Sequence, residues 1–248
     1  MSEGKIALIT GGSSGIGYAI AARYVAEKYT TIITGRNEDK LRKAAESLGP
    51  YCTGIRMDMG CLDQIPAFVQ KVAAKYGRID VLVNNAGINQ KKEFEGVSTE
   101  EFQEIVQVNQ TAIFVLSREV VKVMEQDELG GAIVHISSMA AHYGIPKVIS
   151  YSASKAALEG MTRAMAVELS CKGIRINCVA PGFIETPMSS KALNNDKERK
   201  DKVLSRTPMH RLGCPEDVAN AVYFLTSDQA SFITGETIKV DGGNSIGF

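Results

Sequence analysis

The stretch Thr10-Gly-Gly-Ser-Ser-Gly-Ile-Gly17 decides the fold of this chain. It follows an apolar run, Lys5–Thr10, that predicts a buried strand, and it leads directly into a segment with helical character. Glycines allow a sharp turn and a close backbone approach to a ligand, while the N–H groups at a helix N-terminus attract phosphate. The Gly-x3-Gly-x-Gly spacing differs from the common Gly-x-Gly-x-x-Gly fingerprint, and any tight turn also selects glycine. The strand before it and the helix after it nevertheless favour a turn that binds the pyrophosphate of a dinucleotide.

Short strand-like runs alternate with longer amphipathic stretches along the whole sequence. Most of these runs are apolar throughout, which is typical of parallel strands that helices cover on both faces. The pattern predicts an α/β fold, a doubly wound Rossmann-type sandwich with a seven-stranded parallel sheet, in a single domain spanning residues 1–248. The expected strands are Lys5–Thr10, Thr31–Thr34, Ile55–Met57, Ile79–Val83, Ala132–Ser137, Arg175–Val179 and Thr237–Val240.

Several helix boundaries can also be predicted. Asn37 is a suitable cap for the helix that follows the second strand. Ser98-Thr-Glu-Glu101 fits a capping box that opens a long helix ending near Gln126. Pro215 predicts the first turn of a helix that ends near Leu225.

The overall composition excludes several classes of partner. Lys plus Arg and Asp plus Glu number 28 each, so no net charge attracts nucleic acid or an acidic membrane. No apolar run approaches the roughly 18–20 residues of a membrane span, and Met1–Lys5 leaves no room for a signal peptide. The five cysteines form no Cys-x-x-Cys pair, and with three histidines no common zinc spacing occurs. We therefore expect a cytoplasmic protein with reduced thiols and no metal site.

One charged, turn-rich excursion, Ser189–Arg211, lies between the sixth expected strand and the helix at Pro215. Ligands of doubly wound sheets bind beyond the carboxyl ends of the strands, where this excursion begins. We therefore expect a substrate lid at about 189–211, with a solvated helical insertion as the alternative.

The second expected strand leads into Gly35-Arg36-Asn37, where the adenosine ribose of a dinucleotide would lie. An acidic residue here would bind the 2′-hydroxyl of NAD and repel a 2′-phosphate. Arg36 instead offers a planar guanidinium suited to phosphate. The sequence therefore favours NADP(H), with NAD(H) as the alternative because one residue decides the choice.

The pattern Tyr-x-x-x-Lys occurs at Tyr24/Lys28, Tyr143/Lys147 and Tyr151/Lys155. Such a pair shares one face only where the chain is helical. Gly144 and Pro146 interrupt the second pair, and the first pair begins roughly 13 Å along its helix from Gly15, away from the ligand. The third pair opens a helix-forming stretch soon after a strand ending in Ser137-Ser138. It is the expected proton-transfer pair.

The chemistry of these side chains predicts carbonyl reduction or alcohol oxidation. Free tyrosine has a pKa of about 10 and is a weak base near neutrality. The ammonium group of Lys155 and a positively charged nicotinamide ring would both favour its phenolate. Ser138 can then hold the substrate oxygen while Tyr151 exchanges a proton with it.

On these motifs, the chain resembles the short-chain dehydrogenase/reductase family over nearly its whole length. The matching features are the glycine turn, Asn84-Asn-Ala-Gly87 after the fourth expected strand, Val240-Asp-Gly-Gly243 near the C-terminus, and the catalytic residues Ser138, Tyr151 and Lys155. The resemblance implies a fourth catalytic residue, Asn109, which supports a water chain to the lysine. A buried amide that kinks an apolar helix is the alternative interpretation of Asn109.

The resemblance also implies a set of cofactor contacts. Asp58 fits the position that contacts adenine, although a simple turn residue is the alternative. The stretch Pro181–Thr186 fits the segment that positions the nicotinamide carboxamide. The implied cofactor-binding residues are Gly11, Gly12, Ser13, Ser14, Gly15, Ile16, Gly17, Arg36, Asp58, Met59, Asn85, Ala86, Gly87, Tyr151, Lys155, Pro181, Gly182, Ile184 and Thr186.

The loops beyond the strands suggest a small-molecule carbonyl or alcohol substrate. Ile88-Asn-Gln-Lys-Lys92 and Met139-Ala-Ala-His-Tyr143 offer polar and basic groups for a small hydroxylated or anionic molecule, unless these are merely solvated charges. Asn-Ala-Gly-Ile-Asn-Gln resembles gluconate 5-dehydrogenase-like members, which implies a sugar acid or polyol. The C-terminal segments Pro208–Asp217 and Ile233–Glu236 resemble 3-oxoacyl-acyl-carrier-protein reductases, the alternative.

The resemblance further implies a homotetramer, with segments 98–126 and 151–170 forming one interface. A protein that senses dinucleotides without catalysis is a remote alternative. Such a protein would be expected to lack the tyrosine or the lysine, and this sequence has both.

Overall fold

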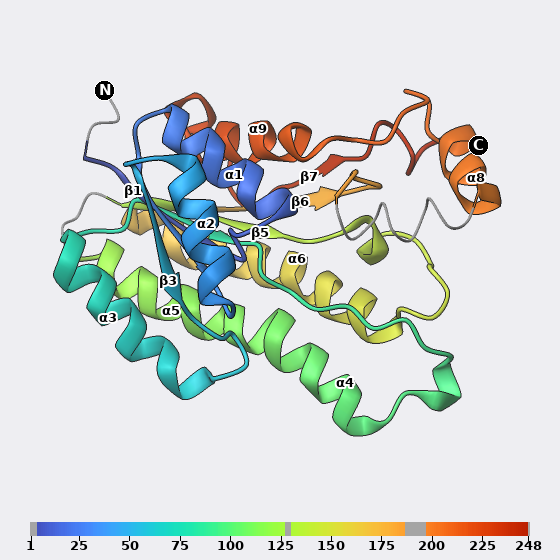
Figure 1. Cartoon of the computed structure of the whole chain (residues 1–248), viewed down its shortest axis with the longest axis horizontal. Helices are drawn as coiled ribbons and strands as arrows, with labels where there is room; N and C mark the ends of the chain where they lie inside the picture. Colours follow the sequence, from blue (N-terminus) through green and yellow to red (C-terminus); the bar gives the residue numbers. More distant parts are fainter. Residues whose placement is uncertain (1–3, 127–129, 187–196, 248) are drawn as a thin grey trace.

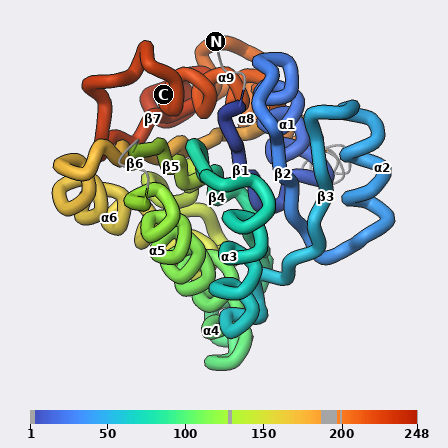
Figure 2. Tube along the Cα trace, turned by 90° about the vertical axis from the view of Figure 1, so that its left-hand side faces the viewer, coloured from blue at the N-terminus to red at the C-terminus, as the bar shows by residue number. Residues whose placement is uncertain are grey.

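A computed structural model describes residues 4–126, 130–186 and 197–247. Its seven strands form one parallel sheet in the order β3-β2-β1-β4-β5-β6-β7, which confirms the predicted doubly wound architecture (Figure 2). Successive connections run one way from β1 and the other way from β4, so the carboxyl ends of β1 and β4 flank the crevice where such sheets bind ligands. The strands are β1 (Ile6–Thr10), β2 (Thr30–Gly35), β3 (Cys52–Arg56), β4 (Val81–Asn84), β5 (Gly131–Ile136), β6 (Ile174–Pro181) and β7 (Thr237–Val240).

Helices cover both faces of the sheet, as the apolar strands require (Figure 1). One face packs against α1 (Gly15–Ala26), α2 (Glu38–Leu48) and α9 (Pro215–Thr226). The other face packs against α3 (Ile65–Tyr76), α5 (Ala112–Met124) and α6 (Ile149–Leu169).

Two shorter helices complete the described part of the chain. The helix α4 (Thr99–Val106) precedes α5, and α8 (Lys197–Arg206) lies beyond the end of the sheet toward which β6 points (Figure 1). None of the helices in the described ranges is both long and apolar enough to cross a membrane.

Alternate residues of each strand supply the two cores. Leu8 and Leu82 pack with α3 and α5, whereas Ile9 and Val83 pack with α1 and α9, and all four are fully buried. Burial of each such side chain contributes about 1.5–3 kcal/mol. The carboxyl edge, where the predicted site residues lie, therefore rests on a well-packed core.

The predicted helix boundaries hold. Asn37 accepts a hydrogen bond from the Lys40 amide, and Ser98 forms the expected capping box with Glu101. The long helix expected from this box runs to Met124, and it contains a π-helical turn at Gln107–Thr111 between α4 and α5. Such turns insert an extra residue and are frequent at functional sites.

Candidate active site

The glycine turn after β1 forms a cradle that side chains would fill. Gly11 and Gly15 have φ angles of +68° and +56°, which favour glycine. A Cβ on Gly17 would overlap the Gly11 carbonyl oxygen, and a Cβ on Gly12 would lie 2.5 Å from the Ile33 side chain. The turn therefore needs glycine both for its shape and for the close packing of α1 against the sheet.

The N-terminus of the helix that follows this turn has no side-chain cap. Ser14 occupies the N-cap position of α1, but its side chain makes no capping hydrogen bond. A Cβ built on Gly15 would lie 3.6 Å from Thr186, so the segment after β6 faces the turn across a narrow gap. The helix N-terminus supplies N–H donors and a partial positive charge to that gap. These residues fit the pyrophosphate of a nicotinamide dinucleotide.

Thr10 and Asn85 join the carboxyl ends of β1 and β4. The Thr10 hydroxyl accepts hydrogen bonds from the amides of Asn85 and Ala86, both at 3.0 Å. The Asn85 side chain donates in return to the Thr10 carbonyl at 2.9 Å and the Gly11 carbonyl at 3.2 Å. Thr10 was not among the predicted cofactor residues, although it begins the glycine motif. Thr10 therefore holds together the two loops that the sequence predicts to bind the cofactor.

A second arginine lies beside the predicted adenosine site. Arg36 follows β2 and is exposed, while Arg56 ends β3 directly opposite Gly35. The Arg56 Nε donates to the Arg36 carbonyl at 3.3 Å, and the Ser13 hydroxyl lies 3.7 Å from the position of a Cβ on Gly35. The Arg56 guanidinium and the Ser13 hydroxyl therefore lie near the end of β2, where Arg36 leaves the strand. Sequence reasoning missed Arg56, because its position depends on the register between two strands.

The predicted adenine contacts divide into a turn residue and a core residue. Asp58 accepts a hydrogen bond from the Gly60 amide at 2.9 Å, which fixes the turn after β3. Met59 is buried in the core beneath α3, so only its backbone is placed to meet a ligand.

The Tyr151 and Lys155 pair lies on α6, one turn apart, at the carboxyl edge of the sheet. The Lys155 Nζ lies 5.7 Å from the centre of the Tyr151 ring and donates to the Ile136 carbonyl at 2.7 Å. Ser138 follows β5 and lies close enough to Tyr151 to lower the pKa of its phenol, while the Ser138 hydroxyl accepts from the Ala140 amide at 3.1 Å. The fold thus brings the three predicted catalytic side chains together.

Burial dominates the electrostatics of this pair. It raises the pKa of Tyr151 above its ordinary value, and the hydrogen bond from Ser138 opposes that effect. Burial also lowers the pKa of Lys155 to about 8, with a small opposing effect from Cys178. We expected Lys155 to lower the pKa of Tyr151. Among the described residues, however, burial and Ser138 are the causes of the Tyr151 shift, and Lys155 is not one of them. Within the part of the chain that the structure describes, Ser138 is the group that favours the Tyr151 phenolate.

Asn109 lies at the centre of the π-helical turn and is fully buried. Its side chain accepts from the Ile88 amide and donates to the Ile88 carbonyl, both at 2.8 Å, and it donates to the Ser154 hydroxyl at 3.1 Å. A Cβ on Gly87 would lie 3.1 Å from Asn109 Oδ1 and 3.5 Å from Lys155 Nζ. Gly87 therefore lies beside both groups, and a side chain at this position would crowd them.

The segment after β6 forms the opposite wall. Pro181 ends β6, and the Gly182 amide donates to the Val240 carbonyl at 2.9 Å. Ile184 then pairs with Gly213 in an isolated bridge. Thr186 ends this described stretch and faces the glycine turn.

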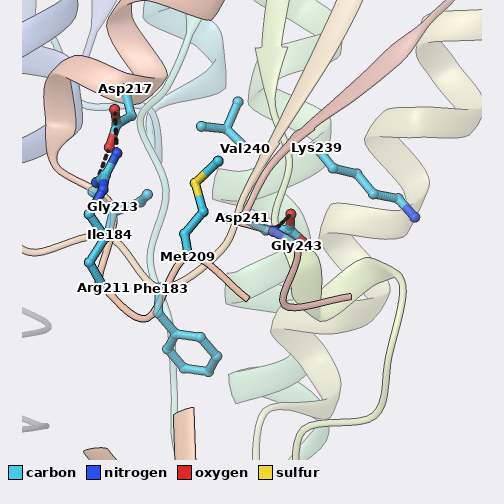
Figure 3. Close-up of a pocket in the computed structure, with 11 residues that line it drawn as sticks. Phe183, Ile184, Met209, Arg211, Gly213, Asp217, Lys239, Val240, Asp241 and Gly243 are labelled. Atoms are coloured by element: carbon cyan, nitrogen blue, oxygen red, sulfur yellow. Dashed lines mark hydrogen bonds and ion pairs between the residues drawn. The ribbon is translucent and has the colours of Figure 1, made fainter. Parts of the chain in front are cut away.

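A cavity of 380 Å³ adjoins this wall at the ends of β6 and β7, as Figure 3 shows. Met209 points into the cavity, and Arg211 is bound to Asp217 at 2.7 Å on one side. Ile184, one of the predicted cofactor-binding residues, also lines this cavity. The predicted lid, Ser189–Arg211, is described only from Lys197 onward, and its residues 189–196 lie outside the described ranges.

Neither rival tyrosine–lysine pair lies on one continuous helix, since α1 ends at Ala26, before Lys28. Tyr24 is fully buried near the far end of α1 and hydrogen bonds to Thr226 at 2.6 Å. Tyr143 precedes a non-helical segment in which Lys147 has a φ angle of +70°.

The polar loop groups expected to meet a substrate are largely engaged within the chain. Lys92 pairs with Glu101 at 2.9 Å and His142 pairs with Glu159 at 2.9 Å. The Tyr143 hydroxyl donates to Asn244 at 3.2 Å. These bonds reduce the number of groups that the loops offer to a sugar acid.

Comparison with known proteins extends these observations. A family model described as enoyl-(acyl carrier protein) reductase matches residues 11–245. A 3-oxoacyl-[acyl-carrier-protein] reductase from Thermotoga maritima is 43% identical over 97% of this chain and 98% of its own length. A 3alpha-hydroxysteroid dehydrogenase from Mediterraneibacter gnavus is 40% identical over 98% of this chain and 97% of its own.

Solved structures resemble this one over nearly the whole chain. A protein described as a short chain dehydrogenase/reductase family protein has a TM-score of 0.89 at 37% identity, with 98% of both chains covered. A candidate NAD(P)-dependent gluconate 5-dehydrogenase from Beutenbergia cavernae, with bound NADP, has a TM-score of 0.91 at 38% identity and covers 97% of this chain and 96% of its own. The chain therefore belongs to the short-chain dehydrogenase/reductase family of oxidoreductase enzymes.

Proposed function

We propose that this enzyme interconverts a ketone and a secondary alcohol with NADP(H). The observation that carries the proposal is the meeting of Ser138, Tyr151 and Lys155 at the carboxyl edge of the sheet, beside the glycine turn. A hydroxyl donor, a titratable phenol and a buried ammonium group are the side chains needed to hold and protonate a carbonyl oxygen.

Each catalytic side chain has a distinct role in this mechanism. Ser138 holds the substrate oxygen. In reduction the Tyr151 phenol donates its proton to that oxygen and becomes a phenolate, and in oxidation the phenolate accepts the proton of the alcohol. Lys155 is held toward Tyr151 by its bond to the Ile136 carbonyl and, while charged, stabilises the phenolate left after donation. Asn109 fixes the backbone of Ile88 and supports the water chain that resupplies a proton to Lys155. The nicotinamide, when bound, supplies or accepts the hydride.

The proposed preference for NADP(H) rests on Arg36 and Arg56. Guanidinium groups bind phosphate through charge-assisted hydrogen bonds, and the end of β2 presents two of them. The NADP in the candidate gluconate 5-dehydrogenase structure is consistent with this preference.

A 3-oxoacyl thioester is the proposed substrate. The Thermotoga maritima reductase at 43% identity supports it, and so do the loop contacts that engage His142 and Lys92 within the chain. A sugar acid or polyol is the second candidate, favoured by the gluconate 5-dehydrogenase likeness. The two differ in what the loops must supply: apolar surface for an acyl chain, and hydrogen-bond donors for hydroxyl groups.

A substrate panel tests the proposal. Purified enzyme is assayed with acetoacetyl-coenzyme A, 5-ketogluconate and a 3-oxosteroid, each with NADPH and with NADH, alongside a Tyr151→Phe variant. We expect the highest kcat/KM for the acetoacetyl thioester with NADPH. A higher kcat/KM for 5-ketogluconate would favour the second candidate. If neither compound is turned over, both substrate candidates are excluded, and reduction of the 3-oxosteroid then tests whether the enzyme reduces ketones.

We also propose a homotetramer. Large apolar side chains are exposed on the helices expected to form the interface, with Phe114 on α5 at 49% and Val167 on α6 at 87% exposure. Phe102 on α4 is 38% exposed. Association would remove this apolar surface from water.

A further inference from the structure

A nearly buried carboxylate lies next to the catalytic residues and has no part in the mechanism above. Glu159 lies on α6, one turn after Lys155, and its side chain is 12% exposed. Its Oε1 accepts a hydrogen bond from the Ser137 hydroxyl at 2.8 Å and lies 2.9 Å from Nε2 of His142. A buried carboxylate is costly unless it is paired, and this one is paired twice.

The two partners of Glu159 flank Ser138 in the sequence. Ser137 directly precedes it, and His142 follows the short 3₁₀ turn Met139–Ala141 that Ser138 caps. Glu159 therefore binds both ends of the segment that carries the Ser138 hydroxyl. The Ser137 hydroxyl also lies 3.1 Å from the Lys155 carbonyl, which adds a second link to α6.

This arrangement ties the turn to the helix that carries the proton-transfer pair. The turn itself is short. Local amide bonds such as Ala141 to Ser138 (2.9 Å) and the burial of Met139 and Ala140 also hold it. A hydroxyl that stabilises a transition state must be held within about 0.5 Å of its productive position by its neighbours. A carboxylate on α6 holds Ser138 in the same frame as Tyr151 and Lys155.

We propose that Glu159 is a positioning residue that sets the location of the Ser138 hydroxyl through Ser137 and His142. This positioning role rests on the proposed function, in which the Ser138 hydroxyl holds the substrate oxygen. It also changes the interpretation of His142, which faces Glu159 rather than offering its Nε2 to a substrate.

A double-mutant cycle tests this positioning role. Glu159→Leu and Ser138→Ala are made singly and together, and kcat is measured with the best substrate of the panel. We expect Glu159→Leu to lower kcat by about tenfold or more, with little change in dinucleotide affinity. In the Ser138→Ala background the same change should have less than a twofold effect. Multiplicative effects of the two changes would overturn the proposal.

Two further variants serve as a control and as a replacement in the double-mutant cycle. Glu168→Leu, on the exposed end of the same helix, is the matched control and should leave kcat unchanged. Glu159→Gln keeps an acceptor for Ser137 but loses the charge that faces His142. If Glu159→Leu does not fold, Glu159→Gln replaces it in the cycle, with a smaller effect and the same dependence on Ser138.

A second measurement separates failure of this proposal from failure of the proposed function. The titration of Tyr151 is followed by NMR of ¹³C-labelled tyrosine, with Tyr151→Phe used for assignment, and needs no substrate. Because the bond from Ser138 lowers the pKa of Tyr151, Glu159→Leu and Ser138→Ala should both raise it by a similar amount. An unchanged Tyr151 titration in Glu159→Leu would overturn the positioning role even if no substrate in the panel is turned over.

Discussion

The register between β2 and β3 brings Arg56 beside Arg36, the two residues on which the proposed preference for NADP(H) rests. Arg36 directly follows β2, and Arg56 ends the adjacent strand β3. The Arg56 Nε donates a hydrogen bond to the backbone carbonyl of Arg36. Glu38 lies 3.9 Å from Arg56 and is largely exposed, so it competes only weakly for that guanidinium.

We expect Arg36→Ala and Arg56→Ala each to weaken NADPH binding by about tenfold at low salt, since each removes a charge-assisted bond to phosphate. NADH binding, which lacks the phosphate, should change by less than twofold. Fluorescence titration measures both affinities, and Arg42→Ala on the exposed face of α2 is the control. Equal losses for NADPH and NADH would contradict the assignment.

His135 is a fully buried histidine beneath the site. Its Nδ1 lies 3.0 Å from the Asn84 side-chain nitrogen, while its Nε2 has no hydrogen-bond partner among the described residues. Burial, with a smaller effect from Lys155, lowers the pKa of His135 to about 3. The folded chain therefore keeps this ring neutral over a range in which an unfolded histidine, with a pKa of about 6.5, becomes charged.

This difference predicts a loss of stability in mild acid. Below pH 6.5 the unfolded state binds a proton that the folded state does not, so the free energy of unfolding falls as the pH falls toward 3. Between pH 7 and 5 the wild type should lose about 2 kcal/mol more than His135→Asn, which retains a partner for Asn84. Urea unfolding at both pH values measures this, with exposed His210→Asn as the control. Equal losses of unfolding free energy in the wild type and His135→Asn would contradict a lowered pKa for His135.

At the scale of elements, Asn244 fastens α8 to the loop after Ser138. This buried residue near the C-terminus accepts from the Tyr143 hydroxyl at 3.2 Å and donates to the Thr207 hydroxyl at 2.9 Å. Its carbonyl accepts from Arg206 at 3.2 Å, and the Arg206 guanidinium lies 5.4 Å from the centre of the Tyr143 ring. The described part of the expected lid is therefore anchored at its C-terminal end.

Removal of this anchor should loosen α8 more than the sheet. Asn244→Ala leaves buried polar partners unpaired and should lower the free energy of unfolding by about 1–3 kcal/mol. Hydrogen exchange should accelerate in α8 while β1 and β4 stay protected. Asn220→Ala, on an exposed position of α9, is the control. Unchanged exchange in α8 would show that Asn244 does not hold it.

The elements that the sequence predicts best are those with local signals. The glycine spacing after β1 and the uniformly apolar strands both reflect constraints within a few residues, and they led to the correct sheet and helices. The π-helical turn could not be predicted, because Asn109 bonds to Ile88 in a distant loop. Glu159 was missed for the same reason, since His142 reaches it only after the loop folds back onto α6.

At the scale of the whole molecule, the exposed apolar helix faces predict self-association. We expect sedimentation velocity to give the mass of four chains, and Phe114→Glu on α5 to give smaller species, because a charge would be buried without a partner. A matched Tyr51→Glu change, at an exposed position outside these helices, should leave the mass unaltered. A wild-type mass of one chain would exclude the tetramer.

The doubly wound sheet explains why site residues from distant segments of the chain lie close together. The carboxyl ends of β1, β4, β5 and β6 meet at one edge, which brings the glycine turn, Gly87, Ser138 and Pro181 together. The helix α6 then adds the proton-transfer pair from the face opposite α1. The central claim is that this pair carries out the proton transfer.

The Tyr151→Phe variant tests that claim most directly. It removes only the phenolic oxygen, so we expect dinucleotide affinity to stay within twofold while kcat falls by roughly 10²–10⁴-fold, the usual contribution of a general acid. Tyr51→Phe, far from the site in an exposed position, is the control and should retain full activity. A Tyr151→Phe variant with wild-type kcat on any accepted substrate would contradict the assignment of Tyr151 as the proton-transfer residue.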